Sequence, residues 1–190
     1  MIIVFWLTTP LQKLMQKINL FQHWLKSKIV QTIPDHKAWQ IHESARAGDG
    51  LLSNESFHLT NWFIPGDLDH AAVVHYPKDG EGVVIEAIGS GVKCVPLLQW
   101  LKDKRRVVLL RRKNTTDAFR YSCGVWAFAQ IGKLSYDTLF RRLRKNSKKK
   151  VTYCARFLCD ALNVRYRGVI EPNELLQESE LMTVLDTETM

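Results

Sequence analysis

The central third of the chain alternates short apolar runs with turn residues. Residues 71–76 (AAVVHY) and 83–88 (VVIEAI) are apolar and largely β-branched, and residues 77–82 (PKDGEG) between them are typical of a turn. This pattern predicts a β-hairpin. Residues 107–110 (VVLL) predict a further strand, and the turn in residues 48–52 (GDGLL) leads into another short apolar run.

Helical spacing dominates the sequence after these strands. Residues 117–131 carry apolar side chains at helical intervals, and Gly132 predicts the end of that helix. Ser135 predicts the start of a second helix that continues to residue 143, and Thr152 the start of a third that continues to residue 162. Strands and helices do not alternate regularly, so the order favours an α+β fold with an antiparallel sheet over a doubly wound fold.

The N-terminal segment predicts a separate amphipathic helix. Thr9 and Pro10 suit a helix start, and apolar residues recur at helical spacing to Ile29 with lysines between them. Such a helix packs on the protein's own core or lies on an anionic membrane surface. Residues 1–7 (MIIVFWL) lack a preceding basic residue and a following cleavage site, so we do not expect a secretory signal. The expected location is the cytoplasm, with attachment to a membrane surface as the alternative.

Charge is distributed unevenly along the 190 residues, a length that suits one domain with appendages. The net charge is +8. Residues 171–190 contain six acidic residues and no lysine or arginine, which leaves +14 on residues 1–170. This asymmetry predicts either that the basic part meets anions or that the acidic segment folds back on it.

The predicted hairpin brings a histidine and a glutamate together. A three-residue loop at 78–80 aligns Ala72 with Glu86, and the two-residue period of strands then places His70 and Glu86 on one face as diagonal neighbours. His75 lies on the other face, whereas a loop of two or four residues would reverse this assignment. A carboxylate beside a histidine orients the imidazole and stabilises its cation.

One of the four cysteines has the position of a nucleophile. The cysteines lie at positions 94, 123, 154 and 159, without a Cys-x-x-Cys pair, so we expect neither structural zinc nor another metal site. Cys154 lies where the last helix begins, and the positive end of a helix lowers the pKa of a thiol. The alternative for Cys154 is an inert buried thiol, which is the expected state of Cys159 among apolar neighbours.

Six short motifs occur in an order that is characteristic of a known family. They are GDGLL at 48–52, DHAAVV at 69–74, VIEA at 84–87, YDxxF at 136–140, YC at 153–154 and EPxxL at 171–175. This order resembles the circularly permuted branch of the papain-like NlpC superfamily of cysteine amidases and peptidases, in which the histidine precedes the cysteine. The resemblance implies an α+β papain-like fold, with helices packed on an antiparallel sheet or small barrel.

The resemblance also implies a mechanism and a set of site residues. Cys154 would be the nucleophile, His70 the general base and Glu86 the residue that orients it, in acyl transfer that needs no cofactor. Tyr153 would line the substrate site. Ala155-Arg156 stands where the family usually has Ser-Glu, a difference that concerns the substrate more than the chemistry.

The expected organisation has three parts. Residues 35–175 form the catalytic domain, 1–34 a helical extension and 176–190 an acidic tail. The expected substrates are peptide amides or, alternatively, lipid acyl groups, with 1–34 as a possible contact to an anionic surface. The basic run at 141–150 supports a different hypothesis, a nucleic-acid-binding module, and a third is a catalytically inactive interaction module. The sequence leaves the oligomeric state open.

Overall fold

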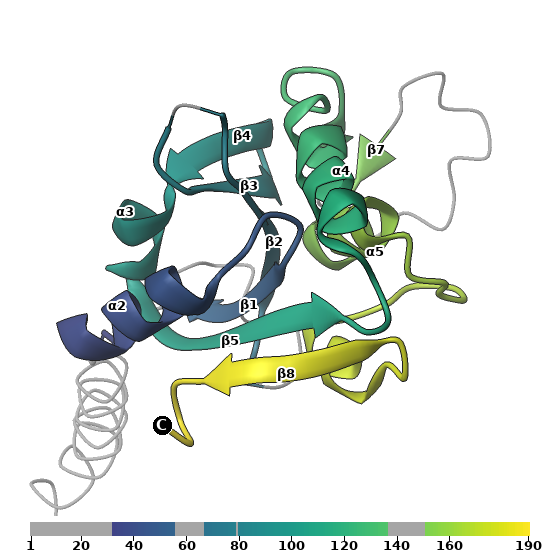
Figure 1. Cartoon of the computed structure of the whole chain (residues 1–190). Helices are drawn as coiled ribbons and strands as arrows, with labels where there is room; N and C mark the ends of the chain where they lie inside the picture. Colours follow the sequence, from purple (N-terminus) through teal and green to yellow (C-terminus); the bar gives the residue numbers. More distant parts are fainter. Residues whose placement is uncertain (1–31, 56–66, 79, 137–150) are drawn as a thin grey trace, which may run out of the picture. The chain divides into compact units, whose positions relative to one another are not determined.

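A six-stranded antiparallel sheet forms the framework of the domain (Figure 1). The computed structural model describes residues 32–55, 67–78, 80–136 and 151–190. The strands follow the order β4-β3-β2-β1-β5-β8, and every neighbouring pair is antiparallel. Their bounds are β1 Gly50–Glu55, β2 His70–His75, β3 Val83–Ile88, β4 Gly91–Pro96, β5 Lys104–Arg112 and β8 Leu181–Asp186. The α+β class and the antiparallel sheet are confirmed, whereas the amphipathic N-terminal segment and the basic run lie outside the described residues.

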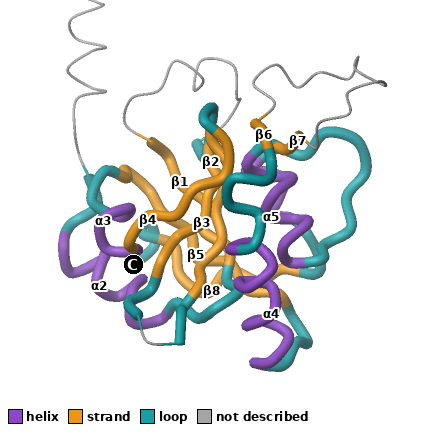
Figure 2. The backbone as a smooth tube through the Cα atoms, turned by 90° about the horizontal axis from the view of Figure 1, so that it is seen from above, coloured by secondary structure: helices purple, strands orange, loops and turns teal. Residues whose placement is uncertain are grey.

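Helices cover both faces of the sheet (Figures 1 and 2). The helices α2 (Asp35–Ser44) and α3 (Leu97–Leu101) pack on one face, and α4 (Asp117–Phe128) and α5 (Cys154–Leu162) on the other. Each face therefore has its own hydrophobic cluster. All six residues of β2 are buried, which explains why its sequence is almost continuously apolar rather than alternating.

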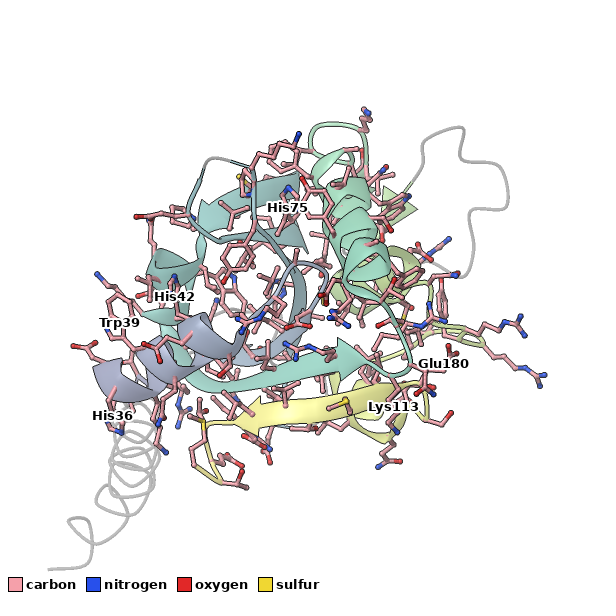
Figure 3. The ribbon with its side chains drawn as sticks, viewed as in Figure 1. His36, Trp39, His42, His75, Lys113 and Glu180 are labelled. Atoms are coloured by element: carbon pink, nitrogen blue, oxygen red, sulfur yellow. The ribbon has the colours of Figure 1, made fainter. Side chains whose placement is uncertain are left out.

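The register of the β2–β3 hairpin is the predicted one. Ala72 pairs with Glu86, and His75 faces α4 on the opposite side of the sheet (Figure 3). The His75 ring lies against the rings of Tyr121 and Phe128, and burial lowers its pKa. His75 is thus a packing residue of the α4 interface, on the face of the sheet opposite to His70 and Glu86.

The turn before β1 requires a glycine. Gly48 has a φ of +76° and its N–H donates to the Val74 carbonyl, so the turn joins β1 to β2. A Cβ at this position would overlap the backbone of Arg120 in α4. Gly48 therefore serves two purposes, a left-handed backbone and a close approach between the turn and a helix.

We expect Gly48→Ala to destabilise the domain far more than Gly132→Ala. Both glycines have positive φ, +76° and +72°, so both variants carry the cost of about 1 kcal/mol of a left-handed alanine. A Cβ at Gly132 meets nothing within 4 Å, whereas at Gly48 it overlaps backbone atoms that cannot rotate away. The expected additional loss at Gly48 is about 2 kcal/mol in the free energy of unfolding. Urea denaturation of both variants measures it, and equal midpoints would contradict the assignment of the clash.

The acidic C-terminal segment is part of the domain. The 3₁₀ helix η2 (Pro172–Gln177) leads into β8, which pairs with β5. Arg106 of β5 holds Asp186 through two hydrogen bonds of 2.6 and 3.2 Å, and Arg112 binds Glu180 at 2.8 Å. Residues 176–190, expected as a tail, thus include a strand of the main sheet. Of the two outcomes expected from the charge asymmetry, the structure shows the folding back of acidic residues onto basic ones.

The region around the last two helices differs from the prediction in one respect. Ser135 was predicted to begin a helix, but Ser135–Tyr136 forms strand β6, which pairs in parallel with β7 (Val151–Thr152). The helix prediction is wrong at these two residues because their backbone groups pair with β7, and residues 137–150 lie outside the described part. Helix α5 begins at Cys154, one residue after the position that a Thr152 cap would give.

Candidate active site

His70 and Glu86 form a buried pair at the hairpin. His70 is the first residue of β2, and its Nε2 lies 2.8 Å from Oε2 of Glu86 on β3. Both residues are buried, at 8% and 4% relative exposure. The diagonal arrangement expected from the loop length is confirmed, since the Ala72–Glu86 alignment leaves His70 one diagonal step away.

The Glu86 carboxylate is bound on several sides. Trp100 of α3 donates its indole N–H to the same Oε2 at 2.8 Å, and Lys93 of β4 lies 3.3 Å from Oε1. The buried Lys104 places its Nζ 4.4 Å from the centroid of the Trp100 ring, a cation–π contact. Three groups from three elements therefore support the carboxylate that holds His70.

These contacts keep Glu86 ionised. Burial by itself raises the pKa of a carboxyl group, but the hydrogen bond and charge of His70, the Trp100 hydrogen bond and the charge of Lys104 together outweigh it. The net effect lowers the pKa of Glu86 to about 2. The carboxylate is thus a permanent negative charge beside the imidazole.

Cys154 is the first residue of α5. Its predecessor Tyr153 has an extended backbone, with φ −134° and ψ 168°, and makes no side-chain capping bond. Cys154 itself is 3% exposed. The thiol thus lies at the positive end of a nine-residue helix whose hydrophobic side is packed on the sheet.

A contact at the C-terminal end of α5 shows which way the helix points. At its C-terminal end, Arg112 donates to the Leu162 carbonyl at 2.6 Å. Arg112 is the last residue of β5. Ser53 of the neighbouring strand β1 pairs with Val107 of β5, so Ser53 lies toward the opposite end of the sheet from Arg112. Ser53 pairs with His70. The N-terminal end of α5, with Cys154, is therefore directed to the end of the sheet where His70 lies.

Residues 170–173 contact both the start of α5 and the segment before β2. The Tyr153 hydroxyl accepts a hydrogen bond of 3.0 Å from the Ile170 N–H. The Asn173 side chain donates to the Leu68 carbonyl at 2.8 Å and accepts from the Leu68 N–H at 3.2 Å. Residues 170–173 thus connect the neighbour of Cys154 to the segment that leads into His70.

The remaining predicted residues have separate roles. Tyr153, expected to line the substrate site, is buried and holds the Ile170 backbone. Asp49, in the turn before β1, has a structural role and pairs with Arg111. Cys159 is fully buried, which raises the pKa of its thiol to about 12, and Cys94 is exposed on β4.

The supporting groups of Glu86 could not be predicted from the sequence. Trp100 is buried like a core residue, but its indole also donates to Glu86. Lys104 follows a turn after α3, where a lysine is ordinarily solvated. No local spacing predicts this arrangement, because α3 and the start of β5 come near Glu86 only once the sheet has formed.

The described residues contain no cluster of metal-ligating side chains and no membrane-spanning helix. Within this part of the chain, no group of three or more His, Cys, Asp and Glu side chains could hold a metal ion. Among the same residues, no helix has the length and apolar character needed to cross a bilayer.

Comparisons with known proteins identify the fold and the family. The crystal structure of YiiX from Escherichia coli O157:H7, described as a metalloprotein, is similar in fold, with a TM-score of 0.57 over 74% of this chain and 96% of that chain at 18% identity. No curated protein sequence gives a significant match. Residues 44–184 match the family described as permuted papain-like amidase enzymes, YaeF/YiiX, C92 family. The chain therefore belongs to this family of permuted papain-like amidases and is a cysteine hydrolase by type.

Proposed function

We propose that the protein is a cysteine amidase of the NlpC superfamily type, in which Cys154 is the nucleophile, His70 the general base and Glu86 the residue that orients His70. The observation that carries this proposal is the buried His70–Glu86 pair at the end of the sheet to which the N-terminus of α5 is directed. The family supports an amide as the substrate.

The hydrogen bond of His70 assigns the roles of its two nitrogens. Nε2 donates to the ionised Glu86, so Nδ1 is the nitrogen that accepts the thiol proton of Cys154. Transfer of this proton gives a thiolate and an imidazolium, and the Glu86 carboxylate stabilises that cation. His70 is the first residue of β2, at the end of the sheet to which the N-terminal end of α5 is directed.

Acyl transfer then follows in two steps. The Cys154 thiolate attacks the amide carbonyl, and its oxygen takes the negative charge beside the backbone N–H of Cys154 at the helix start. His70 returns its proton to the leaving amine as the C–N bond breaks, which leaves a thioester on Cys154. Water, deprotonated by His70, hydrolyses the thioester and restores the thiol.

Alkylation of the four cysteines by iodoacetamide at pH 6 tests the proposal. The native chain and His70→Ala are labelled in parallel and read site by site by mass spectrometry. We expect Cys154 to react at least about tenfold faster than Cys94, although Cys154 is buried and Cys94 exposed, because only an activated thiol is ionised at this pH.

Cys94 is the internal control of the experiment, since His70→Ala should leave its rate unchanged. The advantage of Cys154 should disappear in that variant. Faster labelling of Cys94 in the native chain, or a Cys154 rate that does not depend on His70, would overturn the proposed roles.

A further inference from the structure

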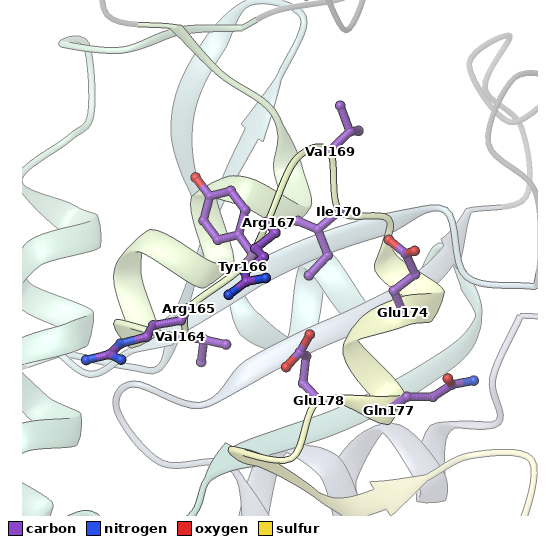
Figure 4. Close-up of a pocket in the computed structure, with 9 residues that line it drawn as sticks. All are labelled: Val164, Arg165, Tyr166, Arg167, Val169, Ile170, Glu174, Gln177 and Glu178. Carbon is purple, nitrogen blue, oxygen red and sulfur yellow. The ribbon is translucent and has the colours of Figure 1, made fainter.

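A groove with a volume of about 890 Å³ lies between the segment after α5 and η2 (Figure 4). Ligand sites in proteins commonly range from about 300 to 1,000 Å³, so the groove has room for several residues of an extended peptide. Arg165 and Arg167 lie on its loop side, and Glu174 and Glu178 on the side of η2. Ile170 lies between them.

Both walls of the groove are bonded to the segments of the proposed catalytic residues. Ile170, on the loop wall, donates its N–H to Tyr153, the neighbour of Cys154. Asn173, in the η2 wall, is bonded in both directions to Leu68, two residues before His70. The loop runs from the C-terminal end of α5 back to Tyr153 at its N-terminal end. The groove therefore leads toward the end of the domain that holds Cys154.

The two walls carry opposite charges that form no ion pair with another described residue. Among the described residues, the guanidinium groups of Arg165 and Arg167 have no acidic partner, in contrast to those of Arg106 and Arg112. The Glu178 carboxylate likewise has no basic partner in the described part of the chain. Two unpaired cations thus face unpaired anionic groups across a space open to a ligand.

We propose that this groove is a substrate subsite for a zwitterionic peptide segment, with an anionic group of the ligand at Arg165 and Arg167 and a cationic group at Glu174 and Glu178. The assignment as a substrate subsite rests on the proposed amidase function. The Glu174 carboxylate also caps η2, because its Oε2 accepts the Glu171 N–H at 2.7 Å, and its other oxygen is the one left for a ligand. A ligand of one sign would meet attraction at one wall and repulsion at the other, so charge of both signs is what the groove selects.

Peptide binding to the full chain carrying Cys154→Ala tests the groove without turnover. Four N-acetylated tetrapeptide amides are titrated by calorimetry at low salt: Ala-Glu-Lys-Ala, Ala-Glu-Glu-Ala, Ala-Lys-Lys-Ala and Ala-Gln-Gln-Ala. We expect the Glu-Lys peptide to bind about tenfold more tightly than the Gln-Gln peptide, since it forms one ion pair at each wall.

Single-charge variants in the same background assign each wall. Arg167→Gln should weaken the Glu-Lys and Glu-Glu peptides by about fivefold and leave the Lys-Lys peptide unweakened. Glu178→Gln should weaken the Glu-Lys and Lys-Lys peptides by a similar factor. Arg105→Gln on β5 is the matched control, because Arg105 does not line the groove, and it should change none of the four affinities.

Equal affinities for all four peptides, or an Arg105→Gln effect as large as that of Arg167→Gln, would overturn the groove proposal. If Cys154 were alkylated selectively in that case, the amidase proposal would hold although the groove proposal had failed. Conversely, charge-selective binding without Cys154 activation would support the groove as a peptide site and refute its link to the proposed chemistry.

Discussion

Asp49→Ala is expected to lower the free energy of unfolding by about 3 kcal/mol. The Asp49 carboxylate is fully buried and both of its oxygens bind Arg111, at 2.8 and 2.6 Å. The same carboxylate accepts the Arg46 N–H at 2.8 Å, which closes the turn before β1. Its removal leaves a partly buried guanidinium and the Arg46 amide without their carboxylate acceptor, and that desolvation cost exceeds the value of the contact itself.

Asp117→Ala is the matched control for this prediction. Asp117 also pairs with an arginine, Arg120, but its side chain is 94% exposed. Water competes for an exposed pair, so we expect a change within about 1 kcal/mol. Urea denaturation of both variants compares a buried with an exposed Asp–Arg pair, and similar losses would show that burial of Asp49 does not matter.

The His70–Glu86 pair could be predicted because its determinants are local. One short loop sets the register of β2 and β3, and strand periodicity then fixes which side chains share a face. The position of Cys154 could also be predicted, since the start of a helix follows from the apolar periodicity of the residues after it. Within about 90 residues, local rules therefore identified all three members of the proposed site.

The parts that could not be predicted depend on contacts between distant segments. Trp100 reaches Glu86 only because α3 turns back over the hairpin, and the Tyr153 hydroxyl meets the backbone of Ile170 across a loop. β8 was missed for another reason. It pairs on one side with β5, and only one of its six residues is buried, so its hydrophobic pattern is weak. The acidic residues around it favoured a tail. The apolar run 181–185 (LMTVL) was the available indication of a strand.

Glu86→Ala is expected to lower kcat/KM for amide hydrolysis by about 100-fold or more. The variant removes the acceptor that fixes the His70 ring and the negative charge that stabilises its cation. Lys93→Gln is the control, because Lys93 also contacts Glu86, at 3.3 Å, but its side chain is 47% exposed and the ion pair is screened by water. We expect Lys93→Gln to change kcat/KM by less than about fivefold, and a Glu86→Ala effect of the same size would contradict the role of Glu86.

The pH dependence separates this role from a purely structural one. The pKa of Glu86 is lowered from 4.5 to about 2, so in the native protein its charge persists until the pH falls toward 2. A lowered carboxyl pKa also means that the pair stabilises the fold above pH 4.5 and that this contribution is lost between 4.5 and 2. Trp100→Phe removes a donor to the ionised form, and the pKa of Glu86 should rise toward its ordinary value.

Alkylation of Cys154 as a function of pH measures this shift. In Trp100→Phe, the rate should fall at a higher pH than in the native protein, while the rates at pH 7 stay close, because Glu86 is ionised there in both. A structural defect would instead lower the rate at every pH. If the rates of the native protein and Trp100→Phe fell at the same pH, Trp100 would not be what keeps Glu86 ionised. The coupling from Trp100 through Glu86 and His70 to Cys154 would then be refuted.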